Sequence, residues 1–131
     1  MTSDPKITPP AGPRTVMVVE DEEGVRDLVA EVLEGSGFRV IQASNGREAI
    51  RLAEQEAVID LVVTDVVMPG MSGFELSRWF AAQRPKTRLI FMTGYTDERT
   101  INREALDPRT ILMQKPFAPA SLLRIINAVF P

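Results

Sequence analysis

Two kinds of hydrophobic pattern alternate along the chain from Thr15 onward. Short runs rich in Val, Ile, Leu and Met are each followed by a longer stretch in which apolar residues recur at helical spacing. This alternation predicts strands joined by crossover helices, and therefore an α/β fold with a parallel sheet. Five strands are predicted: Thr15–Glu20, Phe38–Ala43, Asp60–Asp65, Arg88–Thr93 and Thr110–Gln114.

Three of these runs show almost no alternation between apolar and polar residues. They read Val-Met-Val-Val in the first strand, Leu-Val-Val in the third and Leu-Ile-Phe-Met in the fourth. Continuous apolar runs are typical of parallel strands that are covered on both faces. We therefore expect these three strands in the interior of a doubly wound sheet.

The helices are predicted from apolar stripes and from capping residues. The first carries a stripe that ends before Gly35 and Gly37, made of Val25, Leu28, Val29, Val32 and Leu33. Ser44 or Asn45, followed by Glu48, opens the second helix. Ser72 and Glu75, in capping-box spacing, open the third helix. The fourth is expected from about Asp97 to Leu106, and Pro119 suits the first turn of the last helix.

Length and composition predict one domain. The chain has 131 residues, and residues 1–13 contain four prolines and few large apolar side chains, which favours an extended tail or linker. Residues 14–131 then form the folded unit.

No apolar run approaches the roughly 20 residues needed to span a bilayer, and no signal-peptide core is present, so we expect a cytoplasmic location and no membrane contact.

Charge and residue usage exclude several kinds of chemistry. There are 15 Lys and Arg against 18 Asp and Glu, a net charge of −3, which disfavours direct nucleic-acid binding. The absence of Cys excludes disulfides, thiolate metal sites and cysteine nucleophiles. The absence of His removes the commonest general base and means that the chain cannot carry phosphohistidine itself.

Polar residues stand at the carboxyl ends of four predicted strands, where open parallel sheets bind ligands. These residues are Glu20 and Asp21, Asp65, Thr93 and Lys115. Carboxylates that crowd together repel one another unless a cation neutralises them, and ligation by oxygen alone is typical of Mg²⁺. With Mg²⁺ and Lys115 opposite, Asp65 is a candidate nucleophile for a phosphoryl group, and Thr93 a candidate hydrogen-bond donor to it.

Each of these residues also has a plainer interpretation. Glu20 and Asp21 alone resemble an acidic cluster at a helix N-terminus, and Asp65 before Met-Pro-Gly alone resembles turn chemistry. Thr93 is otherwise a strand end, and Lys115 an ordinary lysine before a proline. Their joint placement favours the metal and phosphate interpretation.

Four segments resemble the signature blocks of bacterial receiver domains, the phosphoacceptor modules of two-component response regulators. They are V-M-V-V-E-D-E at 16–22, V-V-T-D-V-V-M-P-G-M-S-G at 62–73, I-F-M-T-G-Y at 90–95 and Q-K-P-F at 114–117. The resemblance covers about residues 14–131. It implies a doubly wound (βα)5 flavodoxin-like fold with sheet order 2-1-3-4-5. A narrower similarity is to the C-terminal receivers of alphaproteobacterial hybrid sensor kinases.

The resemblance also implies residue roles. Asp65 would be phosphorylated, Asp21 would bind Mg²⁺ directly and Glu20 through water, and the backbone carbonyl of Val67 would be the remaining protein ligand. Thr93 and Lys115 would contact the phosphoryl oxygens, and the Lys115–Pro116 peptide would be cis. The implied partner is a histidine kinase or a histidine phosphotransfer protein, and the expected state is a monomer or weak dimer.

Two positions depart from the commonest receiver pattern. Leu112 stands where many receivers have the Tyr or Phe that follows the threonine inward on activation. Tyr95 either replaces that aromatic by covering the phosphoryl site or is a partly buried aromatic with its hydroxyl in water.

Two other functions remain open on the sequence. One is a receiver-like interaction module that works without phosphorylation, which the presence of all five polar groups disfavours. The other is a phosphatase that forms an aspartyl phosphate, an enzyme class whose nucleophile is normally followed by a second Asp two residues on. Val67 occupies that position, so a phosphoacceptor switch is preferred to an enzyme.

Overall fold

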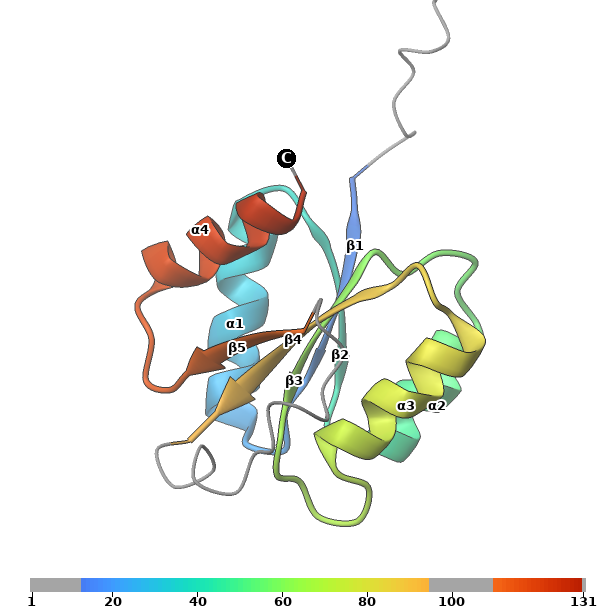
Figure 1. Cartoon of the computed structure of the whole chain (residues 1–131). Helices are drawn as coiled ribbons and strands as arrows, with labels where there is room; N and C mark the ends of the chain where they lie inside the picture. The colour runs from blue at the N-terminus through green and yellow to red at the C-terminus, as the bar shows by residue number, and fades with distance from the viewer. Residues whose placement is uncertain (1–12, 95–109, 131) are drawn as a thin grey trace, which may run out of the picture.

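A central parallel sheet with helices on both faces makes up the described part of the chain (Figure 1). The structure is a computed structural model and describes residues 13–94 and 110–130. Its strands are β1 (Thr15–Val19), β2 (Arg39–Ala43), β3 (Leu61–Asp65), β4 (Arg88–Thr93) and β5 (Ile111–Gln114). Its helices are α1 (Glu23–Gly35), α2 (Gly46–Ala53), α3 (Gly73–Gln83) and α4 (Pro119–Val129).

All strand pairs are parallel, and the sheet order is β2-β1-β3-β4-β5, which confirms the predicted topology. The central strands β1 and β3 are buried along their whole length, as their continuous apolar runs predicted. The strand boundaries differ slightly from the prediction. β1 ends one residue early, at Val19, because its pairing with β3 stops at Val19 opposite Thr64, and β2, β3 and β5 each begin one residue late.

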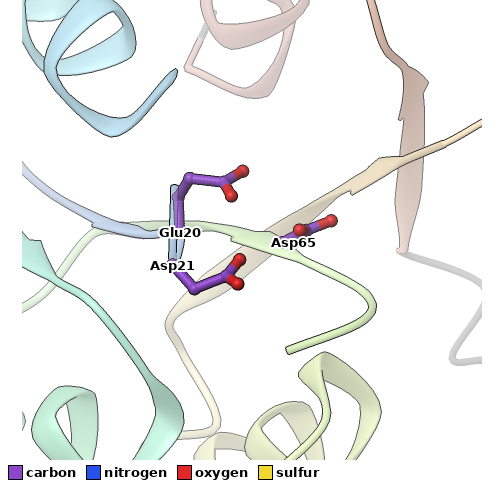
Figure 2. Close-up of side chains that lie close together, drawn as sticks. All are labelled: Glu20, Asp21 and Asp65. Carbon is purple, nitrogen blue, oxygen red and sulfur yellow. The ribbon is translucent and has the colours of Figure 1, made fainter. Parts of the chain in front are cut away.

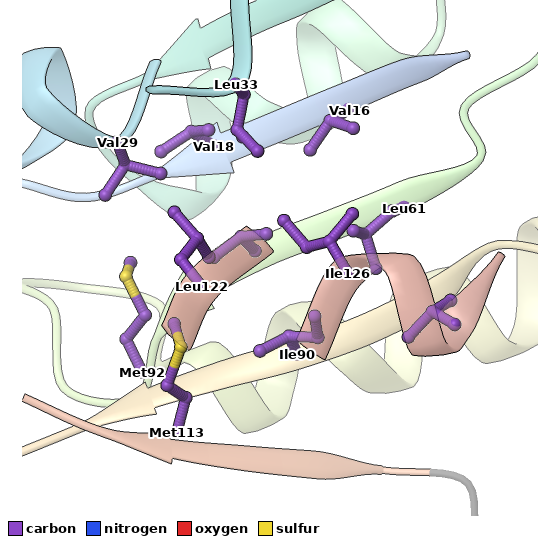
Figure 3. Packing of buried hydrophobic residues seen from close by; sticks show 12 residues of the cluster. Val16, Val18, Val29, Leu33, Leu61, Ile90, Met92, Met113, Leu122 and Ile126 are labelled. Atoms are coloured by element: carbon purple, nitrogen blue, oxygen red, sulfur yellow. The ribbon is translucent and has the colours of Figure 1, made fainter. Parts of the chain in front are cut away.

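Each face of the sheet has its own hydrophobic core. On one face α1 and α4 cover a cluster that includes Val18, Leu33, Ile90 and Ile126 (Figure 3). On the other face α2 and α3 cover a cluster that includes Phe80. Burial of apolar surface on both faces is the main favourable term in folding, at roughly 25 cal/mol per Å².

The predicted caps define the helix starts. Asn45 is the N-cap of α2 and accepts from the Glu48 backbone N–H at 2.8 Å, while the Glu48 carboxylate accepts from the Ser44 N–H instead of that of Asn45. Ser72 and Glu75 form the predicted capping box of α3. Pro119 lies in the first turn of α4, also as predicted.

Two predictions fall on residues that the structure does not describe: the tail, apart from Pro13, and the helix expected from about 97 to 106. Within the described ranges, no helix has both the length and the apolar character needed to cross a membrane.

Candidate functional site

Three carboxylates meet where β1 and β3 end (Figure 2). Glu20 and Asp21 follow β1 directly, and Asp65 is the last residue of β3. One carboxylate oxygen from each residue lies within 4.8 Å of those of the other two. Glu20 and Asp65 are buried, with 1% and 6% of their surface exposed, whereas Asp21 is exposed. The cluster is therefore buried at Glu20 and Asp65 and open to solvent at Asp21.

Backbone pairing holds these residues together. β1 and β3 are neighbours in the sheet, and the Glu20 N–H continues the ladder past the end of β1 by donating to the Ala43 carbonyl at 3.1 Å. The Asp65 side chain is oriented by its own backbone, because the Val66 N–H donates to Asp65 Oδ1 at 3.0 Å. Asp65 Oδ2 remains directed toward the other charged groups of the site.

Gly73 allows α3 to begin directly against the Asp65 backbone. Its N–H donates to the Val66 carbonyl at 2.8 Å, and a Cβ atom at position 73 would overlap the carbonyl oxygen of Asp65. Only glycine fits this close approach without a shift of the backbone. Sequence patterns do not single out Gly73, since the capping box at Ser72 and Glu75 marks where the helix begins but not what its first turn packs against.

Lys115 supplies a positive charge to the cluster from the loop after β5. Its Nζ lies 3.3 Å from Glu20 Oε1 and 3.4 Å from Asp65 Oδ2. The Lys115 N–H donates to the Thr93 carbonyl at 2.8 Å, and the Lys115–Pro116 peptide is cis, as the resemblance implied. One ammonium therefore faces two of the three carboxylates.

Burial and mutual repulsion disfavour the charged forms of the carboxylates. Burial raises the pKa of Asp65, against the opposing effects of the Lys115 charge and of the hydrogen bonds from Lys115 and Val66. Burial also raises the pKa of Glu20, and the Asp65 charge raises it further. For Lys115, burial lowers the pKa, but the two carboxylates together outweigh that effect, so the net shift is upward.

Thr93 ends β4 next to this cluster and is fully buried. Its neighbour Met92 pairs with Asp65, and Thr93 itself pairs with Gln114 immediately before Lys115. Within the described part of the chain, the Thr93 hydroxyl has no hydrogen-bond partner. A buried hydroxyl without a partner costs free energy, and a hydrogen-bond acceptor that reached it would offset that cost.

Three predicted residues remain, and the structure describes two of them, Val67 and Leu112. Val67 follows two residues after Asp65 and is 59% exposed at the rim of the site. Leu112 lies half-buried in β5, paired with Phe91. Tyr95 lies outside the described residues, so its role as a substitute aromatic stays a prediction.

The donors present fit a hard divalent cation. All three are carboxylates, Glu20 and Asp65 among them are buried, and one ammonium, paired with those two, is set against three acidic groups. Mg²⁺ typically binds one or two carboxylates and keeps several waters, which matches a cluster that is open on one side. The raised pKa values of Glu20 and Asp65 describe the cost that such a cation would offset.

Residues 16–127 match the family model for the response regulator receiver domain. Sensor kinase CckA of Brucella abortus is 35% identical over 123 residues, which are 93% of this chain and 13% of that protein. PhoP of Bacillus subtilis, an alkaline phosphatase synthesis transcriptional regulatory protein, is 32% identical over 118 residues, which are 88% of this chain and 48% of that protein. The chain thus spans half or less of the length of these relatives.

Solved receiver structures have the same fold. A receiver domain protein from Clostridium thermocellum matches with a TM-score of 0.80 and 27% identity, covering 88% of this chain and 93% of that one. The receiver domain of hybrid histidine kinase CckA matches with a TM-score of 0.76 and 25% identity, covering 89% and 99%. TrrA of Thermotoga maritima, in complex with Mg(2+)-BeF, matches with a TM-score of 0.75 and 27% identity, covering 88% and 98%.

The sheet order, the signature segments and these matches lead to the same assignment. The narrower similarity to alphaproteobacterial hybrid kinases agrees with the matches to CckA in both sequence and structure. This chain belongs to the response regulator receiver domain family.

Proposed function

We propose that this chain is a phosphoacceptor domain of a two-component phosphorelay, in which Asp65 receives a phosphoryl group from a phosphohistidine of a partner protein. One observation carries the proposal: three carboxylates and one ammonium from separate strand ends gather at one edge of the sheet in a member of the receiver family. Because the chain contains no histidine, the donor must be another molecule or another part of a longer protein.

The proposed transfer follows from the chemistry of the two groups. A carboxylate oxygen of Asp65 attacks phosphorus, an O–P bond forms, and the N–P bond of the phosphohistidine breaks. The electron pair of that bond returns to the imidazole nitrogen, which takes up a proton. The product is an acyl phosphate on Asp65.

In this proposal Lys115 and Thr93 assist the incoming phosphoryl group. Lys115 Nζ, 3.4 Å from Asp65 Oδ2, supplies a fixed positive charge to the phosphoryl oxygens. The buried Thr93 hydroxyl gains a hydrogen-bond partner when a phosphoryl oxygen approaches, and this gain biases the domain toward a second conformation. The output then passes by contact with a partner or by onward transfer of the phosphoryl group.

We assign the magnesium site to Asp21, Asp65 and the Val67 carbonyl, with Glu20 bound through water. The bound ion would supply positive charge opposite the phosphoryl oxygens. The carboxylate cluster supports this assignment, and so does the Mg(2+)-BeF complex of TrrA.

A histidine kinase or a histidine phosphotransfer protein is the proposed donor. Beside Lys115, a cavity of about 380 Å³ is lined mainly by apolar side chains, among them Val25, Leu28 and Phe117. Leu28 belongs to the predicted apolar stripe of α1, yet 50% of its surface is exposed. Exposed apolar surface next to the acceptor is consistent with contact by a protein donor.

Intact-mass spectrometry tests the proposal most simply. The protein is incubated with phosphoramidate and Mg²⁺, and we expect one added phosphoryl group that EDTA prevents and hydroxylamine removes. Asp65→Asn should gain none. Asp27→Asn, which changes an exposed carboxylate on α1, is the matched control and should be labelled like the wild type. Equal labelling of Asp65→Asn and the wild type would reject Asp65 as the acceptor.

A further inference from the structure

Arg26, in the second turn of α1, reaches back to the end of β1. Its Nη1 donates a hydrogen bond of 2.8 Å to the backbone carbonyl of Glu20. The Arg26 side chain is half-buried, and the Arg26 backbone N–H donates to the Glu22 carbonyl at 3.0 Å. The guanidinium therefore extends from a hydrogen-bonded turn of α1. It binds the carbonyl of the first residue after β1.

The carbonyl that Arg26 contacts belongs to the peptide unit joining Glu20 to Asp21. This peptide is planar, so the direction of its carbonyl also sets the direction in which the chain leaves toward Asp21. The Glu20 N–H is fixed on the other side by the Ala43 carbonyl, at 3.1 Å. Together, the β2 backbone and Arg26 define the orientation of the link between two of the three carboxylates.

The positive charge of Arg26 also acts on Glu48, in the first turn of α2. Glu48 accepts hydrogen bonds from the Ser44 N–H at 2.6 Å and the Ser44 hydroxyl at 2.9 Å, and these bonds are the main reason that its pKa is lowered. The charges of Arg51 and Arg26 contribute to the same shift.

We propose that Arg26 is a positioning residue, which fixes the Glu20–Asp21 peptide and so sets the affinity and selectivity of the carboxylate cluster for Mg²⁺. Mg²⁺ requires near-ideal octahedral geometry, whereas Ca²⁺ accepts irregular coordination. A loosened peptide should therefore weaken the binding of Mg²⁺ more than that of Ca²⁺. This inference rests on the proposed function, since it takes the cluster to be a metal site.

A purely electrostatic role predicts the opposite result. If Arg26 acted only as a nearby positive charge, it would repel the metal ion, and its removal would strengthen the binding of both cations. A lysine in its place would then leave the affinities unchanged. The positioning role predicts weaker Mg²⁺ binding after removal of the arginine and only partial recovery with lysine, whose ammonium lacks the planar fork of the guanidinium.

The test is calorimetric titration of the whole chain, without phosphodonor, with Mg²⁺ and with Ca²⁺. Arg26→Gln, whose side chain is too short to reach the Glu20 carbonyl, should weaken Mg²⁺ binding about tenfold, as is typical for residues that orient metal ligands. Its Ca²⁺ affinity should change less, and Arg26→Lys should fall between Arg26→Gln and the wild type. Arg47→Gln is the matched control: it removes an exposed charge from a cavity that Asp21 also lines and should not weaken Mg²⁺ binding.

Thermal unfolding of the metal-free variants separates positioning from a general loss of fold. If Arg26→Gln is not folded, Arg26→Lys carries the test. Unchanged or tighter Mg²⁺ binding in the folded Arg26 variants, or an equal loss for both cations, would overturn the inference while leaving the proposed function intact. A wild type that binds no Mg²⁺ would overturn both, and the intact-mass experiment would register that failure independently.

Discussion

At the amino edge of the sheet, where the strands begin, polar groups pair with backbone groups at short distances. At the carboxyl edge, where the strands end, two buried carboxylates are gathered around a single ammonium. At the amino edge, Asp60 Oδ2 accepts from the Thr15 N–H at 2.8 Å, and the Thr87 hydroxyl donates to the Ile59 carbonyl at 2.7 Å. Arg84 Nη2 donates to the Ala53 and Glu56 carbonyls at 2.6 and 2.8 Å, although its Nη1 has no partner among the described residues.

The carboxyl edge is different in its energetics. Two buried carboxylates share one ammonium at 3.3 and 3.4 Å, and the buried Thr93 hydroxyl has no partner among the residues that the structure describes. Burial raises the pKa of both carboxylates, so their charged state is costly in the absence of a ligand. The comparison indicates that the amino edge contributes stability, while the carboxyl edge gives up stability to hold the charged groups that the proposed function requires.

Gly73→Ala should have the largest effect. The added Cβ would overlap the Asp65 carbonyl oxygen, and neither backbone can yield without disturbing the site. We expect a loss of about 3 kcal/mol in the free energy of unfolding, measured by urea denaturation, together with loss of phosphorylation. Gly35→Ala, where the added Cβ meets open space at the end of α1, is the matched control and should keep both properties. Near-wild-type phosphorylation of Gly73→Ala would mean that Asp65 is not held by this contact.

Asp60→Ala should weaken the amino edge alone. It removes the acceptor of the Thr15 N–H at the start of β1, and a buried donor left without a partner costs about 1–2 kcal/mol. Urea denaturation should register this loss, while the Mg²⁺ affinity from calorimetry should stay at the wild-type value. A fall in Mg²⁺ affinity would show that the two edges are coupled.

Asp65→Asn should stabilise the metal-free protein at neutral pH by about 1 kcal/mol, since it removes a buried charge whose pKa is raised while Glu20 still pairs with Lys115. The sign follows from the raised pKa. The folded state keeps the Asp65 proton longer than the unfolded state, so wild-type stability is lost as the pH rises from the ordinary value of 3.8 through the raised one. Melting temperatures in EDTA should therefore differ most at neutral pH and converge below about pH 4. A variant that melts below the wild type at pH 7 would contradict this interpretation.

Glu56→Gln should have the smallest effect. Its pKa is lowered by the hydrogen bonds and charge of Arg39, at 2.8 and 3.0 Å, so its contribution is present above the ordinary value of 4.5 and is lost as the pH falls through the lowered one. The Arg39 side chain is half-exposed and the Glu56 side chain partly exposed, and ion pairs that water reaches contribute little. A slight fall in melting temperature at pH 7, absent in high salt, is expected. A fall that is independent of salt would indicate a role other than charge.

These two edges also differ in how far the sequence predicts them. Apolar runs predict the strands, and the rule that ligands bind at the carboxyl ends of parallel strands predicts the gathering of Glu20, Asp21, Asp65 and Lys115. The strand order was implied only by the resemblance to receiver domains. Strand boundaries shift by one residue because hydrogen-bond pairing, not hydrophobicity, decides where a strand ends.

Contacts between a side chain and a distant backbone carbonyl leave no such pattern. Arg26 reaches the Glu20 carbonyl and Arg84 the Ala53 carbonyl, and each arginine alone looks like an ordinary helix residue. The same holds for Gly73, whose importance lies in an approach between two backbones. The 50% exposure of Leu28, in a stripe whose other members are buried or half-buried, is likewise not visible in the pattern.

Chemical trapping of the acceptor tests the central claim most directly. After incubation with phosphoramidate and Mg²⁺, borohydride reduces an aspartyl phosphate to homoserine, and peptide mass spectrometry locates the changed residue. We predict homoserine at position 65 and nowhere else, with none formed in EDTA. Reduction at another carboxylate, or at position 65 to the same extent without a divalent cation, would contradict the claim that the Asp65 cluster is a magnesium-dependent phosphoacceptor site.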